Sequence, residues 1–158
     1  MKAGAVVFLV LILASTGGAR ARNSSARDCL QGLAPALAAG SFSGSTDCRH
    51  DRLAIEKIGD VRTSGHRYAV YDYRYRLRPA CPGCAIRGGQ RVIIMKDGRY
   101  LGQYKPYRAV VTVRGETLIL SSATSGRSAS GSSVIVPLGT REPPPALVFD
   151  GEPLAFFK

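Results

Sequence analysis

The tetrapeptide Cys-Pro-Gly-Cys at positions 81–84 is the motif in this sequence with the clearest potential for chemistry. A Cys-x-x-Cys pair exchanges disulfides when its first thiol lies at the start of a helix, where the helix dipole favours the thiolate. The residues that follow include two adjacent glycines, Gly88 and Gly89, which do not open a helix. We therefore predict a structural disulfide. The alternative is a thiol–disulfide oxidoreductase with Cys81 as nucleophile and Cys84 as resolving thiol.

The other two cysteines are Cys29 and Cys48. If the chain is exported, as its N-terminal residues indicate, four cysteines most simply form two disulfides. Four cysteines allow three pairings. The spacing favours Cys29 with Cys48 and Cys81 with Cys84. Structural zinc modules usually carry two Cys-x-x-Cys pairs, whereas this chain has one. We expect neither a metal site nor a cofactor.

Side chains for acid–base or nucleophilic catalysis are few. The two histidines are His50 and His66, and the expected disulfide at Cys48 removes the one nucleophile close to His50 in the sequence. The serine-rich segment around Ser128 does not match the Gly-x-Ser-x-Gly elbow of hydrolases. We predict no catalytic residue.

Arginines and tyrosines alternate between residues 71 and 78. Side chains of a strand alternate between its two faces, so this pattern predicts tyrosines facing inward and Arg74, Arg76 and Arg78 facing solvent. Stacking of single-stranded nucleic acid needs both residue types on one face, so we expect no specific nucleic-acid ligand. An arginine face instead suits anionic polymers such as lipopolysaccharide or acidic glycans. The arginines that can contribute to such a face are Arg74, Arg76, Arg78, Arg87, Arg91, Arg99 and Arg108.

Charge and hydropathy indicate an exported basic protein. The 158 residues include 22 Lys and Arg against 11 Asp and Glu, a formal net charge of +11. Lys2, the apolar run 3–14 and the sequence Ala19-Arg20-Ala21 have the order of a secretory signal peptide, predicted at residues 1–21. Its removal takes Lys2 and Arg20, leaving 20 − 11 = +9 on residues 22–158. No apolar run reaches the ~18 residues of a transmembrane helix, so we expect none in the mature chain.

The remaining pattern predicts a single all-β domain over residues 22–158. A short helix is expected from Asp28 to Gly40, with Pro35 kinking or shortening it. Period-two alternation begins at Leu53, and the turns expected to join strands are Asp97-Gly98, Arg114-Gly115-Glu116 and Asp150-Gly151. Seven serines in the 13 residues 121–133 predict a flexible loop. These features favour a mainly antiparallel small meander barrel or sandwich with one N-terminal helix.

The sequence thus favours a periplasmic or extracellular β domain with a non-catalytic binding role. Its expected partner is an anionic envelope component or another protein. Besides the oxidoreductase, a second alternative is an inhibitor or accessory subunit of an envelope complex, docked through a sheet edge or the proline-rich segment.

Overall fold

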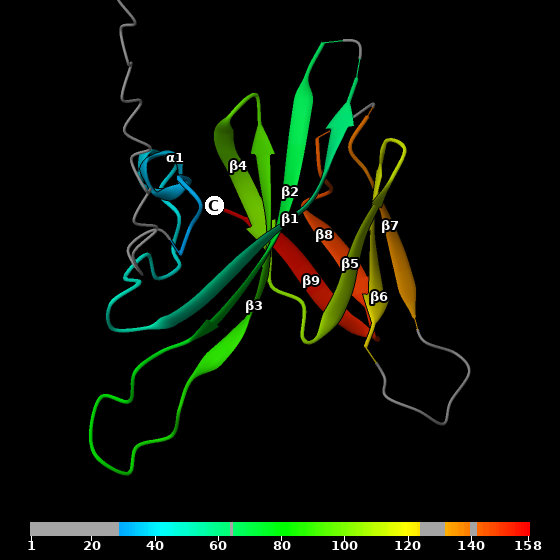
Figure 1. Cartoon of the computed structure of the whole chain (residues 1–158). Coiled ribbons are helices and arrows are strands. Elements are labelled where there is room, and N and C mark those ends of the chain that lie inside the picture. The colour runs from blue at the N-terminus through cyan, green and yellow to red at the C-terminus, as the bar shows by residue number, and fades with distance from the viewer. Residues whose placement is uncertain (1–28, 64, 124–131, 140–141) are drawn as a thin grey trace, which may run out of the picture.

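The computed structural model describes residues 29–63, 65–123, 132–139 and 142–158. Within these ranges the chain is mostly antiparallel β with one short helix, as predicted (Figure 1). The elements are α1 (Ala34–Ala39), β1 (Arg52–Arg62), β2 (Arg67–Arg76), β3 (Gly88–Lys96), β4 (Arg99–Tyr104), β5 (Ala109–Arg114), β6 (Thr117–Ser122), β7 (Ser133–Pro137), β8 (Ala146–Phe149) and β9 (Glu152–Phe157). No helix in these ranges is long and apolar enough to cross a bilayer.

The strands form a six-stranded sheet, ordered β1-β2-β3-β4-β9-β8, and a three-stranded sheet, β5-β6-β7. The smaller sheet covers part of one face of the larger sheet, and the segment with α1 lies on the other side (Figure 1). Strand β1 lies beside β5, and β7 beside β8. No hydrogen-bonded ladder joins either pair in the described ranges, so the two sheets do not close into a barrel.

All three predicted turns join neighbouring antiparallel strands. Asp97 and Gly98 have φ of 50° and 78°, and Asp150 and Gly151 have 53° and 81°. Positive φ at both central residues defines the type I′ turn, whose twist matches that of the strands it connects. These hairpins are therefore determined locally.

The predicted helix over 28–40 is wrong in its first half. Asp28 lies outside the described residues, and Gln31 and Gly32 have positive φ of 51° and 79°, which no helix accommodates. The side-chain amide of Gln31 donates to the carbonyl of Ile55 at 2.9 Å. Helix α1 begins only at Ala34, with Pro35 in its first turn, where a missing N–H costs no hydrogen bond.

The larger sheet is buried on both faces over its middle. One core lies between the two sheets and includes Val70, Val92 and Leu120. A second core lies under the N-terminal segment and includes Leu37 and Tyr73. The Cys29–Cys48 disulfide, with 5.8 Å between its Cα atoms, links the two ends of that segment.

Two predicted segments fall largely outside the described residues. The signal peptide at 1–21 lies wholly outside, and so do residues 124–131 of the predicted serine-rich loop. The ends of that loop are strand: β6 continues to Ser122 and β7 begins at Ser133.

Candidate anion-binding groove

The arginine face of β2 begins where the smaller sheet stops covering the larger one. Along this face Tyr68 and Val70 belong to the core between the sheets, and Asp72 is only 7% exposed. Arg74 and Arg76 follow and are exposed. Arg74 and Arg76 within the strand and Arg78 beyond its end are thus exposed, as predicted. The first half of this face of β2 is core instead.

Two arginines lie directly opposite each other at this end of the sheet. Arg52 of β1 pairs with Arg76 of β2, so both side chains are on one face. Like charges in directly opposed positions destabilise an antiparallel pair. Neither arginine has a carboxylate within ion-pair distance among the described residues.

The other end of the same two strands shows the contrast. Arg62 pairs with Arg67, again two arginines in opposed positions. Here Asp60 Oδ2 lies 3.1 Å from Arg67 Nη2 and 2.7 Å from Lys57 Nζ. Hydrogen bonds from Arg67 and Lys57 hold the pKa of Asp60 below its usual range, outweighing the small effect of burial. The Arg62–Arg67 pair thus has a neighbouring carboxylate, whereas the Arg52–Arg76 pair has none among the described residues. We call the second pair bare.

Glycines keep the surface beside Arg76 open. Gly88 lies opposite Arg76 in the pairing of β2 with β3, and Gly89 lies opposite Tyr75. A Cβ on Gly88 would lie 2.7 Å from the carbonyl oxygen of Tyr75, closer than a carbon atom can approach. At the position directly opposite Arg76, β3 therefore carries no side chain on this face, which leaves a groove.

The connection between β4 and β5 forms the opposite wall. Tyr107 is 79% exposed, and the guanidinium carbon of Arg108 lies 5.4 Å from the centre of its ring. Arg108 has φ of 53°, a left-handed conformation that is unfavourable for a side chain of this size. Strained backbone of this kind is concentrated at binding sites.

Gln90 fastens this wall to the larger sheet. Its Nε2 donates to Asp72 Oδ1 at 2.9 Å and to the carbonyl of Ala109 at 2.8 Å. Its Oε1 accepts the N–H of Ala109 at 2.8 Å. The second oxygen of Asp72 accepts Arg74 Nε at 3.0 Å, so Arg74 is already ion-paired.

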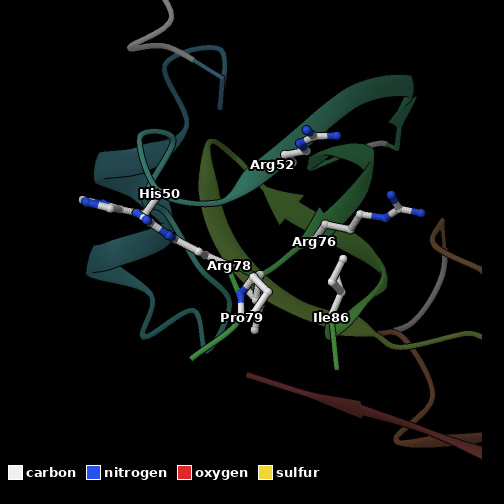
Figure 2. Close-up of a pocket in the computed structure, with 7 residues that line it drawn as sticks. His50, Arg52, Arg76, Arg78, Pro79 and Ile86 are labelled. Atoms are coloured by element: carbon white, nitrogen blue, oxygen red, sulfur yellow. The ribbon is translucent and has the colours of Figure 1, made fainter. Parts of the chain in front are cut away.

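The groove between these walls has a volume of about 830 Å³, and its lining includes Arg74, Arg76, Arg108, Tyr107, Val110 and Ile86. A second hollow of about 390 Å³ adjoins it and is lined by His50, Arg52, Arg76, Leu77, Arg78, Pro79 and Ile86. Figure 2 shows the side chains of Arg52 and Arg76 on one side of this second hollow and that of Arg78 on the other, where His50 lies. Arg76 lines both hollows.

The three arginines predicted from the sequence have different surroundings. Arg76 is central, Arg74 is paired with Asp72, and Arg78 lies beyond the end of β2. The backbone N–H of Arg78 donates to Asp51 Oδ1 at 3.0 Å. Sequence reasoning did not pair Arg52 with this group, because that required the register of β1 against β2.

Two other arginines of the sequence set lie elsewhere. Arg91 is 7% exposed and is on the opposite face, between the rings of Phe42 and Tyr75 at 5.3 and 5.4 Å. Its Nη1 donates to Ser43 Oγ at 3.1 Å, so it joins the N-terminal segment to the sheet. Arg99 follows the β3–β4 turn, at the far end of β3 from Gly88.

Both predicted disulfides are confirmed: Cys29–Cys48 and Cys81–Cys84. The second lies in the exposed connection between β2 and β3, where Cys84 N–H donates to the carbonyl of Cys81 at 3.1 Å. The residues directly after Cys84 form no helix, and β3 begins at Gly88. The disulfide constrains the connection that carries Ile86, a lining residue of both hollows.

The histidines are bound to aspartates. His50 Nδ1 lies 2.6 Å from Asp47 Oδ2, and His66 Nδ1 lies 2.7 Å from Asp97 Oδ2. Backbone N–H donors, assisted by the histidine side chains, lower the pKa of both aspartates. The described residues contain no group of three or more His, Cys, Asp and Glu arranged to hold a metal ion.

Comparison with protein-family models, curated proteins and solved structures finds no match to this chain.

Proposed function

We propose that this protein binds an anionic envelope component across the groove and the adjoining hollow, without catalysing a reaction. The observation that carries the proposal is the bare Arg52–Arg76 pair. Opposed like charges reduce stability in the free protein, and an anion between them removes that cost. Arg108 supplies a third positive charge from the opposite wall.

The chemistry of the groove specifies the bound group. Guanidinium groups bind phosphate, sulfate and carboxylate through paired, charge-assisted hydrogen bonds. Lipopolysaccharide phosphates and acidic glycans carry such groups. An exported location is part of the proposal, supported by two disulfides, which persist in oxidising compartments, and by the predicted signal peptide.

Titration with polyphosphate and with polygalacturonate tests the proposal, because these soluble polymers carry phosphate and carboxylate without an apolar part. Isothermal titration calorimetry of the oxidised protein should show binding that weakens as salt rises. Arg76→Glu and Arg52→Glu should each weaken it at least about tenfold, a change of about 1.4 kcal/mol. Arg62→Glu makes the same charge change at the other end of β1 and is the matched control. Equal loss in all three variants would mean that only net charge matters, and the proposal would be wrong.

A further inference from the structure

Exposed apolar side chains are concentrated in the same groove as the arginines. In the described ranges, five large hydrophobic residues are exposed. Three of them line the groove: Ile86 at 61%, Tyr107 at 79% and Val110 at 49%. The other two, Ile135 and Val148, belong to β7 and β8 and line neither hollow.

Arginines and exposed apolar side chains in one groove restrict the class of ligand further than charge alone does. A soluble phosphate or sugar polymer has no apolar part to cover Ile86 and Val110. Bases of a nucleic acid stack on aromatic rings, and the groove offers one exposed ring, Tyr107, beside two aliphatic side chains. An ion with a hydrocarbon chain attached satisfies both parts of the lining.

We propose that the groove docks on an anionic phospholipid bilayer. Arg76 and Arg108 in the groove and Arg52 in the adjoining hollow bind lipid phosphates, and Ile86, Tyr107 and Val110 contact the acyl region below them. This inference rests on the proposed anion binding and identifies the anion as the phosphate group of a membrane lipid. Stable attachment to a bilayer generally needs two signals, and a basic cluster with adjoining apolar side chains provides both.

The backbone connections that carry Ile86 and Tyr107 are held in place by a disulfide and by hydrogen bonds, which suits insertion of these side chains into a bilayer. Ile86 follows the Cys81–Cys84 disulfide in a connection that extends beyond the end of the large sheet (Figure 1). The N–H of Leu77 donates to the carbonyl of Arg87 at 2.8 Å, which closes the base of this connection. Tyr107 lies beside the left-handed backbone of Arg108, whose carbonyl accepts the N–H of Ala123 at 3.1 Å. Tyrosine is enriched at the membrane–water interface because its ring is amphipathic.

The sequence contains no tryptophan, so the fluorescence of one introduced tryptophan reports directly on insertion at its position. Tyr107→Trp places a single indole in the groove, and Val148→Trp places one at an exposed apolar position outside it. The oxidised protein is mixed with vesicles of phosphatidylglycerol in phosphatidylcholine, with and without brominated acyl chains. The proposal predicts a blue shift and quenching by bromine for Tyr107→Trp and neither for Val148→Trp. No quenching of Tyr107→Trp on vesicles that bind the protein would overturn the proposal.

A second pair of variants separates lipid docking from anion binding. Ile86→Ser combined with Val110→Ser should weaken vesicle binding at least about tenfold more than polyphosphate binding. Ile135→Ser combined with Val148→Ser should leave both unchanged, and thermal unfolding confirms that each variant is folded. If the first pair binds vesicles like the wild type, lipid docking is wrong while anion binding stands. If the wild type binds neither polymer nor vesicle, the proposed function itself fails. Binding of a single-stranded oligonucleotide that depends on Tyr107, with no vesicle binding, would replace lipid docking by nucleic-acid binding.

Discussion

Arg76→Glu should make the protein more stable and its anion binding weaker. In the wild type Arg76 of β2 lies directly opposite Arg52 of β1. Among the described residues, no carboxylate lies within ion-pair distance of either arginine. The substitution replaces a like-charge pair with an opposite-charge pair at the same positions. Cross-strand charge pairs change stability by roughly 0.2–1 kcal/mol in either direction.

The expected gain is about 1 kcal/mol at low ionic strength. Roughly half comes from removing the repulsion and half from the new attraction, both reduced because the side chains are solvated. For a domain of this size that corresponds to a Tm higher by about 3 °C. Most of the gain should disappear in concentrated salt, because salt screens exposed charges.

Binding should change in the opposite direction. Losing one arginine near an anionic surface costs about 1 kcal/mol, and the new carboxylate adds repulsion of similar size. Together these reduce affinity roughly 30-fold. Differential scanning calorimetry at low and high salt measures stability, and titration calorimetry with polyphosphate measures binding.

The matched control is Arg62→Glu. Arg62 also faces an arginine, Arg67, but Asp60 already compensates that partner. The control should therefore show a smaller rise in Tm and keep polyphosphate affinity within about twofold. A Tm for Arg76→Glu that is unchanged or lower at low salt would refute the idea that Arg52 and Arg76 repel each other.

Three further changes have defined outcomes. Gln90→Ala leaves the buried N–H of Ala109 without its acceptor and should lower the free energy of unfolding by about 2 kcal/mol, measured by urea denaturation, while also weakening polyphosphate binding. Replacing Cys81 and Cys84 together by serine removes a short loop closure and should cost at most roughly 2 kcal/mol, with weaker vesicle binding; insulin reduction by the wild type but not by this variant would instead support the oxidoreductase. The lowered pKa of Asp60 means that its contribution to stability is present above the unfolded pKa and is lost as pH falls below roughly 4, so Asp60→Asn should flatten the acid side of a plot of Tm against pH.

Local signals in the sequence were sufficient for several elements. The Asp-Gly turns were predicted because positive φ at both central residues is a property of two adjacent positions. The disulfides followed from spacing, and the inward tyrosine face from strand alternation, with Tyr73 fully buried. In the N-terminal segment the helix predicted from Asp28 was wrong over its first half, because the left-handed backbone at Gln31 and Gly32 delays its start to Ala34.

Predicting the groove would have required information that the alternation of residue types along a strand does not contain. The face that carries Arg76 also carries Val70, and only the extent of the smaller sheet determines which part is core. Arg52 joins Arg76 through strand register, and Arg108 joins from another connection 32 residues further along the chain. Arg91 looked equivalent in the sequence, but it lies under the N-terminal segment.

The most direct test of anion binding in the groove is an NMR titration with polyphosphate that follows the Nε–Hε signals of the arginine side chains. We predict the largest shifts at Arg52, Arg76 and Arg108, together with the backbone amides of Gly88 and Gly89 beside them. Arg62 at the other end of β1 should move little. Shifts of equal size at Arg62 and at Arg52, Arg76 and Arg108 would show that the polymer binds the basic surface as a whole, and would contradict the proposed site.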